Sequence, residues 1–255
     1  MRNIVKGDDV SKVLLAGESW VSDVTDHKGF DPFPHTQVHI GCEKLLEVLR
    51  NNGHEVTHLK SHDVSTNFPF SIDELNEYDV VILSDVGANS LLLPPQVFEE
   101  GKKTPNRLKV IRDWVRQGGG LLMAGGYLSF QGFQAKANYA GSPVEEALPV
   151  SIFHWDDRVE TPEGARPQLS ATAHTITEDL DEDWPDLLGY QLLTPKDGSE
   201  VLATINDDPL LITTDFGEGR SAAFASDISP HWVPEEFMAW NGYGKLFNNI
   251  INWLS

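Results

Sequence analysis

The sequence predicts an α/β fold in which a mostly parallel β-sheet lies between two layers of helices. In the first half of the chain, buried-strand patterns alternate with amphipathic helix patterns three times, as right-handed β-α-β crossovers require. These apolar runs end on glycine or polar residues, which is typical of parallel strands leaving a sheet at its carboxyl edge. The second half has shorter strand patterns separated by Pro, Gly and Asp, which favours antiparallel additions to the sheet.

The first unit begins with the apolar run at residues 12–17 and continues into a long polar segment. Residues 18–35 include two prolines, and we expect them to form a loop that walls a site, because structureless loops of this length are usually functional. From Gln37 the apolar side chains recur at helical spacing, and Asn52-Gly53 supplies a left-handed stop. The first helix is therefore predicted to start near Gln37.

The following units are more regular. Residues 54–59 alternate as a strand, and the spacing of Ser71 and Glu74 matches a capping box at a helix start. The other predicted elements are a buried strand at 78–85, a helix opened by Thr104-Pro105 and ended by the glycines at 118–120, a strand at 121–124, short strands at 152–153, 200–204 and 210–214, a hairpin turn at 216–220, a strand at 221–227 and a terminal helix at 234–254.

The chain is strongly acidic, which excludes two classes of partner. It carries 19 Lys and Arg residues against 39 Asp and Glu residues, a formal net charge of −20. Nucleic acid and anionic membrane surfaces would be repelled, so neither is expected to bind. Hydrophobic residues make up 40% of the 255, which is typical of a globular protein whose acidic surface aids solubility.

Cys42 is the single cysteine, which excludes an intramolecular disulfide framework and a cysteine-based zinc cluster and fits a reducing compartment. The first ten residues lack the apolar region of a signal peptide, and no apolar run is long enough to cross a bilayer. We therefore expect a cytoplasmic protein with one domain at residues 1–255 and no cofactor.

Several glycines and strand ends resemble those of the class I glutamine amidotransferase-like superfamily, including its trehalose-utilisation-like branch. The residues that carry the resemblance are the opening 13–18, the glycine-rich stretch 118–127, His174-Thr175-Ile176, residues 219–227 and Pro230-His231-Trp232. The resemblance follows the order of elements over most of the chain. It implies a flavodoxin-like three-layer sandwich with a mostly parallel sheet and antiparallel additions in the C-terminal half.

The resemblance also implies where a nucleophile would stand. In active members a strand runs into a tight G-x-C-x-G turn that exposes a cysteine, whose thiolate a helix N-terminus and a nearby His-x-Glu pair support. Here that position falls on Gly126 or Tyr127, and neither residue can form a thioester. Cys42 belongs to an apolar helical pattern elsewhere and is interpreted as buried and inert. Glutamine hydrolysis by the family mechanism is therefore not expected.

Polar and aromatic residues follow the predicted strands, and carboxyl ends of parallel strands are where ligands bind in such sheets. Two carboxylates and a histidine, Glu18, Asp227 and His231, are candidate catalytic groups. Aromatic rings can stack on the C–H faces of a sugar or polyol, and carboxylates and amides can accept hydrogen bonds from its hydroxyls. The candidate ligand-binding residues are Trp20, Asp85, Asn89, Gly126, Tyr127, Ser129, Gln131 and Trp232. The alternative is that Asp85 and Asp227 cap turns while Trp20 and Trp232 complete the core.

Two further patterns are weaker. Ser129 could act as a nucleophile with His231 and Asp227, although no glycine flanks it as in a G-x-S-x-G elbow. Histidines recur every fourth residue, which would align metal ligands on a helix, but the strand predicted at 54–59 separates the first set. We expect no metal site at these histidines, which are His54, His58 and His62, and His35 and His39.

Three functions remain open from the sequence. The first is an amidotransferase-like domain without glutaminase activity that binds a small polar ligand, such as a carbohydrate, in a crevice at the strand ends. The second is a cysteine-independent hydrolase that uses Asp227, His231 and Glu18. The third is a homo-oligomeric scaffold whose site is vestigial.

Overall fold

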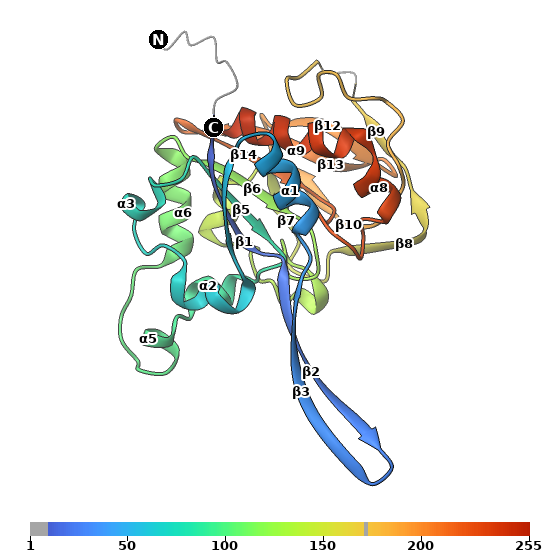
Figure 1. The fold of residues 1–255 in the computed structure, drawn as a ribbon. Coiled ribbons are helices and arrows are strands. Elements are labelled where there is room, and N and C mark those ends of the chain that lie inside the picture. The colour runs from blue at the N-terminus through green and yellow to red at the C-terminus, as the bar shows by residue number, and fades with distance from the viewer. Residues whose placement is uncertain (1–9, 171–172) are drawn as a thin grey trace.

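The protein has an eight-stranded central sheet with helices on both faces, the flavodoxin-like α/β fold that the sequence predicts (Figure 1). The computed structural model describes residues 10–170 and 173–255. The strands are β1 (Lys12–Gly17), β2 (Ser19–Lys28), β3 (Asp31–Ile40), β4 (Glu55–Leu59), β5 (Val80–Ser84), β6 (Gly120–Ala124), β7 (Val150–Ile152), β8 (Arg158–Ala165), β9 (Pro167–Leu169), β10 (Leu187–Gln191), β11 (Leu193–Pro195), β12 (Glu200–Ile205), β13 (Asp208–Phe216) and β14 (Gly219–Phe224).

Five strands of the central sheet run parallel, in the spatial order β4-β1-β5-β6-β14. Ranked by their position in the chain, that order is 2-1-3-4-5, which is the order of flavodoxin-like sheets. β5 and β6 are buried along their whole length, as expected for strands covered on both faces. The antiparallel strands β13, β12 and β9 extend the sheet beyond β14, as the composition of the second half predicts.

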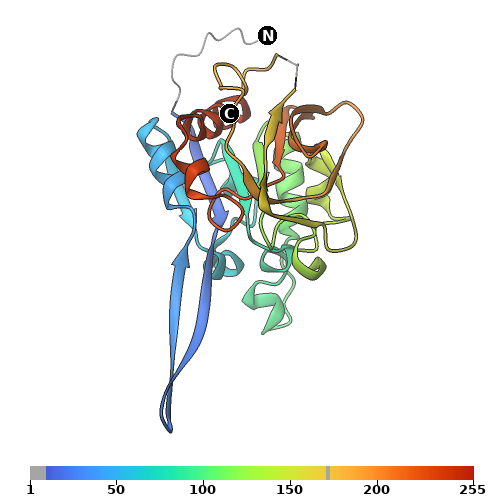
Figure 2. The ribbon, with the colours of Figure 1, turned by 90° about the vertical axis from the view of Figure 1, so that its right-hand side faces the viewer.

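Helices cover both faces of this sheet. Figure 2 shows α1 and α9 on one side and α6 on the other. The apolar residues predicted on the α6 pattern, Leu108, Ile111, Trp114 and Val115, are all buried. The helices are α1 (Glu43–Asn51), α2 (Ser61–Asn67), α3 (Ile72–Leu75), α4 (Ala88–Leu92), α5 (Pro95–Phe98), α6 (Arg107–Arg116), α7 (Pro143–Ala147), α8 (Glu235–Ala239) and α9 (Asn241–Leu254), with a 3₁₀ turn η1 (Phe133–Ala135).

The predicted loop at residues 18–35 is wrong, because this segment forms a long β-hairpin with the residues that follow it. β2 and β3 pair over ten residues each around the turn Gly29-Phe30, and the hairpin projects from the body (Figures 1 and 2). Pro32 and Pro34 argue against a strand, but they occupy alternate positions whose nitrogens face away from β2, so the pairing survives. We call residues 19–40 the arm.

Several predicted helix boundaries are also corrected. The first helix starts at Glu43 and not at Gln37, because β3 continues to Ile40. The helix predicted from Thr104-Pro105 starts at Arg107, where Asn106 caps it. The terminal helix is two helices, since Trp240 adopts an extended backbone between α8 and α9. No helix is predicted where α2 forms, because its Ser, Thr and Asn residues are weak helix formers.

Candidate functional site

The site lies where the order of the parallel strands reverses. From β1 the chain crosses to β4 on one side and then to β5 on the other, so the loops after β1 and β5 diverge at the carboxyl edge of the sheet. Glu18 follows β1 and Asp85 follows β5, and the Glu18 N–H donates to the Ser84 carbonyl at 2.9 Å. Two of the predicted site residues therefore lie at the switch point, where ligands bind in sheets of this type.

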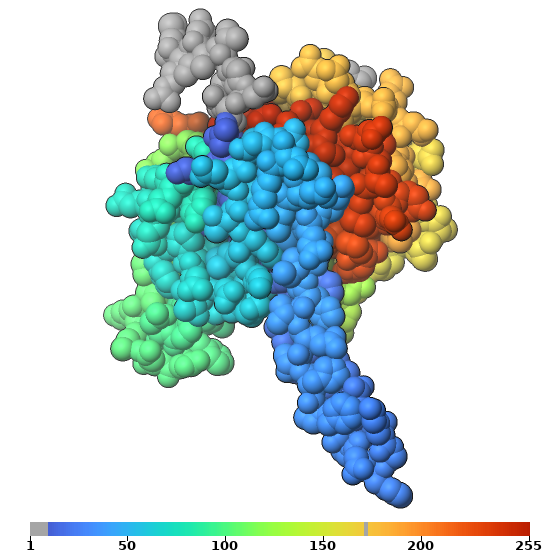
Figure 3. All heavy atoms as spheres, in the orientation of Figure 1, coloured from blue at the N-terminus to red at the C-terminus, as the bar shows by residue number. Residues whose placement is uncertain are grey.

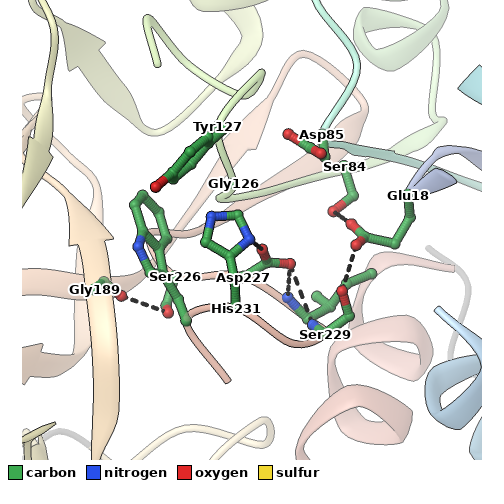
Figure 4. A network of polar contacts seen from close by, with 12 residues as sticks. Glu18, Ser84, Asp85, Gly126, Tyr127, Gly189, Ser226, Asp227, Ser229 and His231 are labelled. Carbon is green, nitrogen blue, oxygen red and sulfur yellow. Dashed lines mark hydrogen bonds and ion pairs between the residues drawn. The ribbon is translucent and has the colours of Figure 1, made fainter. Parts of the chain in front are cut away.

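The Glu18 carboxyl group is buried between two serine hydroxyls (Figure 4). Ser84 Oγ donates to Glu18 Oε2 at 2.6 Å, and Ser229 Oγ donates to Oε1. Burial, and secondly the nearby Asp85 carboxylate, raise the pKa of Glu18 to about 7. Glu18 can thus hold or release a proton near neutral pH. Ser84 and Ser229 were not identified from the sequence, because a serine at a strand end or in a loop has no pattern that distinguishes it from other serines.

Asp85 lies beside the glycine turn that follows β6. Its backbone N–H donates to Ser129 Oγ at 2.9 Å, and its Oδ1 accepts a hydrogen bond from the Leu128 N–H at 2.6 Å. Burial raises the pKa of this carboxyl group as well. Because Ser129 Oγ is engaged by the Asp85 backbone, Ser129 helps to hold this turn, and the described residues provide no hydrogen bond between it and His231.

Both carboxylates stand on unusual backbone. Glu18 has φ of 50° and Asp85 has φ of 47°, in the left-handed region that side chains rarely adopt. Each such residue costs roughly 1–3 kcal/mol, and residues of this kind cluster at binding and catalytic sites. Two such residues lie at the ends of neighbouring strands. Their backbone conformation indicates a functional site at this edge of the sheet, independently of the chemistry of their side chains.

Asp227 and His231 approach the same cluster from the segment after β14. Asp227 is buried, and its Oδ1 accepts hydrogen bonds from the N–H groups of Ile228 at 2.7 Å and Ser229 at 3.2 Å. Asp227 Oδ2 lies 3.8 Å from His231 Nδ1. Burial, and then the charges of Glu18 and Asp85, raise the pKa of Asp227 well above its usual range, while burial lowers the pKa of His231. Protonated carboxyl groups beside a neutral imidazole are therefore favoured.

Aromatic rings form the wall of the cluster opposite Glu18 (Figure 4). The Tyr127 ring meets the His231 ring edge-on, with centroids 4.1 Å apart, and stacks on Phe133 at 5.5 Å. The Arg158 guanidinium lies 4.7 Å from the Tyr127 ring centre, and the buried Trp232 donates from Nε1 to Glu160 Oε2 at 2.9 Å. Tyr127 is thus held by packing on three sides.

Arg158 and Glu160 come from β8, in a part of the chain where the sequence predicts only additions to the sheet. They pair with each other at 3.1 Å, and the Tyr127 hydroxyl lies 3.4 Å from Glu160 Oε1. Charged residues at alternate positions are typical of a solvent-exposed strand, so Arg158 and Glu160 do not stand out in the sequence. Only the fold brings them beside Tyr127. No local signal could have identified them.

The turn after β6 has no room for a side chain until Tyr127. A Cβ at Gly125 would lie 2.4 Å from Gln191 Oε1, and a Cβ at Gly126 would lie 3.2 Å from the Asp85 side chain. Gly126 has φ of +133°, and its carbonyl accepts a hydrogen bond from Gln191 Nε2. The buried Gln191 was not identified from the sequence. The turn resembles a nucleophile elbow in its backbone, but the next helical segment is η1, so no helix begins directly at the turn.

Cys42 lies outside this turn. It is buried immediately before α1, and its Sγ lies 3.5 Å from His58 Nε2. Burial, and secondly the Glu18 charge, raise the pKa of the Cys42 thiol to about 12. The thiol is therefore protonated near neutral pH and is a weak nucleophile.

Three predicted ligand-binding residues are not brought into the cluster. Trp20 lies on the arm and stacks on His39 with ring centroids 5.1 Å apart. Gln131 is buried in the loop after β6, where its Oε1 accepts a hydrogen bond from the Ala140 N–H at 3.2 Å. Asn89 is exposed in the first turn of α4. A position shortly after a predicted strand does not distinguish a residue that lines the cluster from one that lies on the arm, in a loop or on a helix.

The predicted histidine triplet is dispersed, and the pair His35 and His39 lies on β3 of the arm. His54 bonds to Asn248 at 3.0 Å, His58 Nε2 lies 2.9 Å from the Gly17 carbonyl, and His62 is on α2. Across residues 10–170 and 173–255 no group of three or more His, Cys, Asp or Glu side chains is arranged to hold a metal ion. In the same residues, no helix is both long enough and apolar enough to span a membrane.

The strand order and the glycine turn after β6 together define an α/β protein of the class I glutamine amidotransferase-like type. The chain belongs to the GATase1_like family, described as "Putative glutamine amidotransferase", whose model matches residues 12–255. Among curated proteins, none matches the sequence.

Solved structures support the same assignment. The cytoplasmic protein STM3548 from Salmonella typhimurium is 42% identical with a TM-score of 0.91, covering 95% of this chain and 98% of that one. The cytoplasmic protein STM1381 from Salmonella typhimurium LT2 is 41% identical with a TM-score of 0.91, covering 96% and 99%. A ThuA-like protein from Bacteroides uniformis, 12% identical with a TM-score of 0.55 over 100% of this chain and 95% of that one, shares the fold alone.

Proposed function

We propose that this chain is a glutamine amidotransferase-like protein without glutaminase activity that binds a small polyhydroxylated ligand, such as a sugar or polyol, at the strand-end cluster. The observation that carries the proposal is the turn after β6, where a Cβ on Gly125 would lie 2.4 Å from Gln191 Oε1 and a Cβ on Gly126 would lie 3.2 Å from the Asp85 side chain. The family reaction requires a thiolate there. The one thiol of the chain is buried elsewhere, with its pKa raised to about 12.

The chemistry of the cluster favours a neutral, hydroxyl-rich ligand. Carboxyl groups with raised pKa values can both donate to and accept from hydroxyls, and Glu18 and Asp227 have such values. Asp85, Tyr127 and His231 are partly exposed and would meet the ligand first. The Tyr127 and His231 rings offer apolar surface to the C–H groups of a sugar. An anionic ligand would be repelled by the net charge of −20.

Thermal unfolding with glucose, trehalose, sorbitol and L-glutamine as probes tests the binding proposal. A ligand at a hundred times its dissociation constant should stabilise the protein by about 2.7 kcal/mol. Asp85→Asn should remove most of that gain, because asparagine tolerates left-handed backbone and can still accept from Leu128, so that only the charge is lost. Glu77→Gln, an exposed carboxylate outside the cluster, is the matched control. No stabilisation by any sugar or polyol would count against binding.

Ammonia release from L-glutamine tests the absence of glutaminase activity. The wild-type protein and the Cys42→Ser variant should both release ammonia only at the background rate. Turnover by the wild-type protein that Cys42→Ser abolishes would contradict the proposal, because it would require the buried thiol to become a nucleophile.

The Asp227–His231 pair supports a second candidate, a hydrolase that needs no cysteine. His231 Nδ1 lies 3.8 Å from the Asp227 carboxylate, and Glu18, with a pKa of about 7, could act as a general base. A panel of ester, amide and glycoside substrates should then show a turnover that His231→Ala removes and that the exposed-site variant His62→Ala retains. A panel without turnover would exclude these substrate classes.

We also propose that the protein is cytoplasmic. The support is that two relatives, each more than 40% identical over nearly the whole chain, are described as cytoplasmic proteins. Fractionation of cells that produce the tagged protein tests this, and recovery with the membrane fraction would overturn it.

A further inference from the structure

The arm carries an unusual concentration of exposed apolar side chains. Five of the ten large hydrophobic residues that are exposed in the described part of the chain lie within its 22 residues. They are Trp20 (43% exposed), Val21 (45%), Phe30 (104%), Phe33 (42%) and Val38 (51%). Figure 3 shows the arm reaching away from the body without other segments packed on its visible face. Exposed patches of this kind on soluble proteins mark interaction surfaces.

The arm also lacks the partners that stabilise a sheet. It is a two-stranded sheet of its own, and isolated hairpins are at best marginally stable in water without a third strand or a packed face. Val21 and Val38 are directly opposite each other, so they form one exposed apolar patch on a single face. A partner that adds a strand to one edge of the arm and covers the Val21–Val38 patch would supply both the third strand and the packed face.

The outer edge of β3 is open for pairing near the base of the arm. Pro32 and Pro34 face their nitrogens outward, and by the same alternation the N–H groups of Thr36, Val38 and Ile40 also point outward. The prolines block the edge near the tip, whereas residues 35–40 contain no proline and no charged Asp, Glu, Lys or Arg. Charge and proline are the usual protections of an edge strand. Their absence from 35–40 leaves that stretch able to accept another strand.

Charge selects the occupant. A chain of net charge −20 repels a second copy of itself over most of its surface, and β3 beyond Asp31 is a stretch without acidic side chains on which two copies can meet. β3 itself offers a basic partner no carboxylate beyond Asp31, and the nearest carboxylate on the patch face, Asp23 of β2, already accepts a hydrogen bond from Thr36 Oγ1 at 2.9 Å. Antiparallel pairing of β3 with β3 of a second copy is also self-complementary about a two-fold axis, as a symmetric dimer interface must be.

We propose that the arm is the dimerisation element of this protein, with residues 36–40 of β3 pairing antiparallel with the same residues of a second copy. The product is a four-stranded sheet in which the Val21–Val38 patches of both copies share one face. Because the pairing is centred near the base and the strands are antiparallel, the tip of each arm, with Phe30 and Phe33, points toward the body of the other copy.

Sedimentation equilibrium over a wide range of concentrations tests the proposal. The wild-type chain should have twice the 28.3 kDa mass of one copy at high concentration. Val38→Lys places a charge on the patch, and Val38→Pro removes an outward N–H at a position of the same parity as Pro32 and Pro34, so both should give a single-copy mass with the fold intact. Trp155→Lys, which changes an exposed aromatic residue off the arm, is the matched control and should remain dimeric.

Two outcomes overturn the proposal. A wild-type chain that keeps the mass of one copy at every concentration has no dimerisation element. A wild-type oligomer whose mass is unchanged in Val38→Lys associates through another surface. A larger oligomer that Val38→Lys reduces supports the arm as one of its interfaces. Circular dichroism of the variants confirms that the body is folded, and the readout is independent of ligand binding at the strand-end cluster.

Discussion

At the scale of single residues, Glu18 makes stability depend on pH. Its pKa is about 7 in the folded protein against 4.5 for the free side chain, mainly because the carboxyl group is buried. The folded state therefore binds more protons than the unfolded state between these values. The stabilising contribution is complete below pH 4.5 and is lost as pH rises through 7, an effect on the order of 3 kcal/mol in the free energy of unfolding. Asp85 and Asp227 act in the same direction.

Glu18→Gln should flatten this profile. The amide is neutral at every pH, as the protonated acid is, and the hydroxyls of Ser84 and Ser229 can still reach it. Urea unfolding of the wild-type protein should show stability falling between pH 5 and 8, and the variant should show a smaller fall. Glu77→Gln, an exposed carboxylate, should keep the wild-type slope. Equal slopes in the wild-type protein and Glu18→Gln would show that Glu18 is ionised throughout.

Arg107 shows how one buried cation holds two helices. Its fully buried guanidinium donates to five backbone carbonyls at 2.7–3.2 Å, belonging to the C-terminal parts of α2 and α4 and to Phe68. Helix C-termini leave carbonyls without partners and favour positive charge. Burial lowers the pKa of Arg107 to about 10, so the group stays protonated at neutral pH.

Arg107→Lys should be destabilising although it keeps the charge. An ammonium group has three donors and cannot satisfy five carbonyls in a fork arrangement. The Val64 carbonyl also accepts from the Phe68 N–H, so at least one of the other acceptors would be buried without a partner. The expected loss in the free energy of unfolding is about 2–4 kcal/mol, measured by urea denaturation. Arg116→Lys, at an exposed pair with Asp113, should change stability by less than about 0.5 kcal/mol. A similarly small change for Arg107→Lys would mean that water replaces the missing donors.

At the scale of elements, the arm joins the body at the candidate site. Glu18 directly precedes β2, and the Gly41 N–H that follows β3 donates to the Glu18 carbonyl at 3.0 Å. A Cβ on Gly41 would lie 2.6 Å from Glu18 Oε1 and 2.7 Å from Ser229 Oγ. The return strand of the arm thus passes against the Glu18 carboxyl group, and a movement of the arm would displace it.

Gly41→Ala should displace the Glu18 carboxyl group and destabilise the protein by about 1–3 kcal/mol, because both contacts are closer than a methyl group permits. Gly244→Ala makes the same chemical change in α9, where the nearest atom to a Cβ is 3.4 Å away on Val48. It should stabilise by about 0.5–1 kcal/mol, the helix preference for alanine over glycine. Thermal unfolding of both variants tests whether Gly41→Ala lowers the stability of the protein while Gly244→Ala raises it. Equal and small effects would mean that the Glu18 region yields to the methyl group.

At the scale of the whole molecule, buried apolar periodicity was enough to predict the parallel half of the sheet. β5 and β6 read as apolar runs because both faces are covered, and the apolar positions of α6 recur as its buried stripe. The arm could not be recognised in the same way. Its strands are buried on neither face, so apolar and polar residues do not alternate with the two-residue period of a half-buried strand. Pro32 and Pro34 are also typical of loops, and they are compatible with a strand only because they lie on its unpaired edge.

The candidate site was predictable only where it lies at strand ends. Glu18, Asp85 and Asp227 follow strands and could be grouped by the rule that such ends meet at one edge. Arg158, Glu160 and Gln191 enter from the antiparallel half, whose packing against the turn after β6 is set by topology. The same rule misplaced Trp20. It follows β1 closely in the sequence and was therefore expected at the end of that strand, but the chain continues directly into β2 and carries Trp20 onto the arm.

The net charge of −20 gives the proposed dimer a specific dependence on salt. Two copies that meet through uncharged edges and apolar patches gain little from ion pairs and are opposed by long-range repulsion between their bodies. Raising ionic strength from about 0.01 M to about 0.15 M shortens the screening length from about 30 Å to about 8 Å. The dimer dissociation constant, measured by sedimentation, should therefore fall as salt is added, and Val38→Lys should stay single at both ionic strengths. If salt instead weakened the wild-type dimer, its interface would depend on ion pairs, for example between Asp26 or Asp31 near the tip of the arm and basic groups, and not on the open edge of β3.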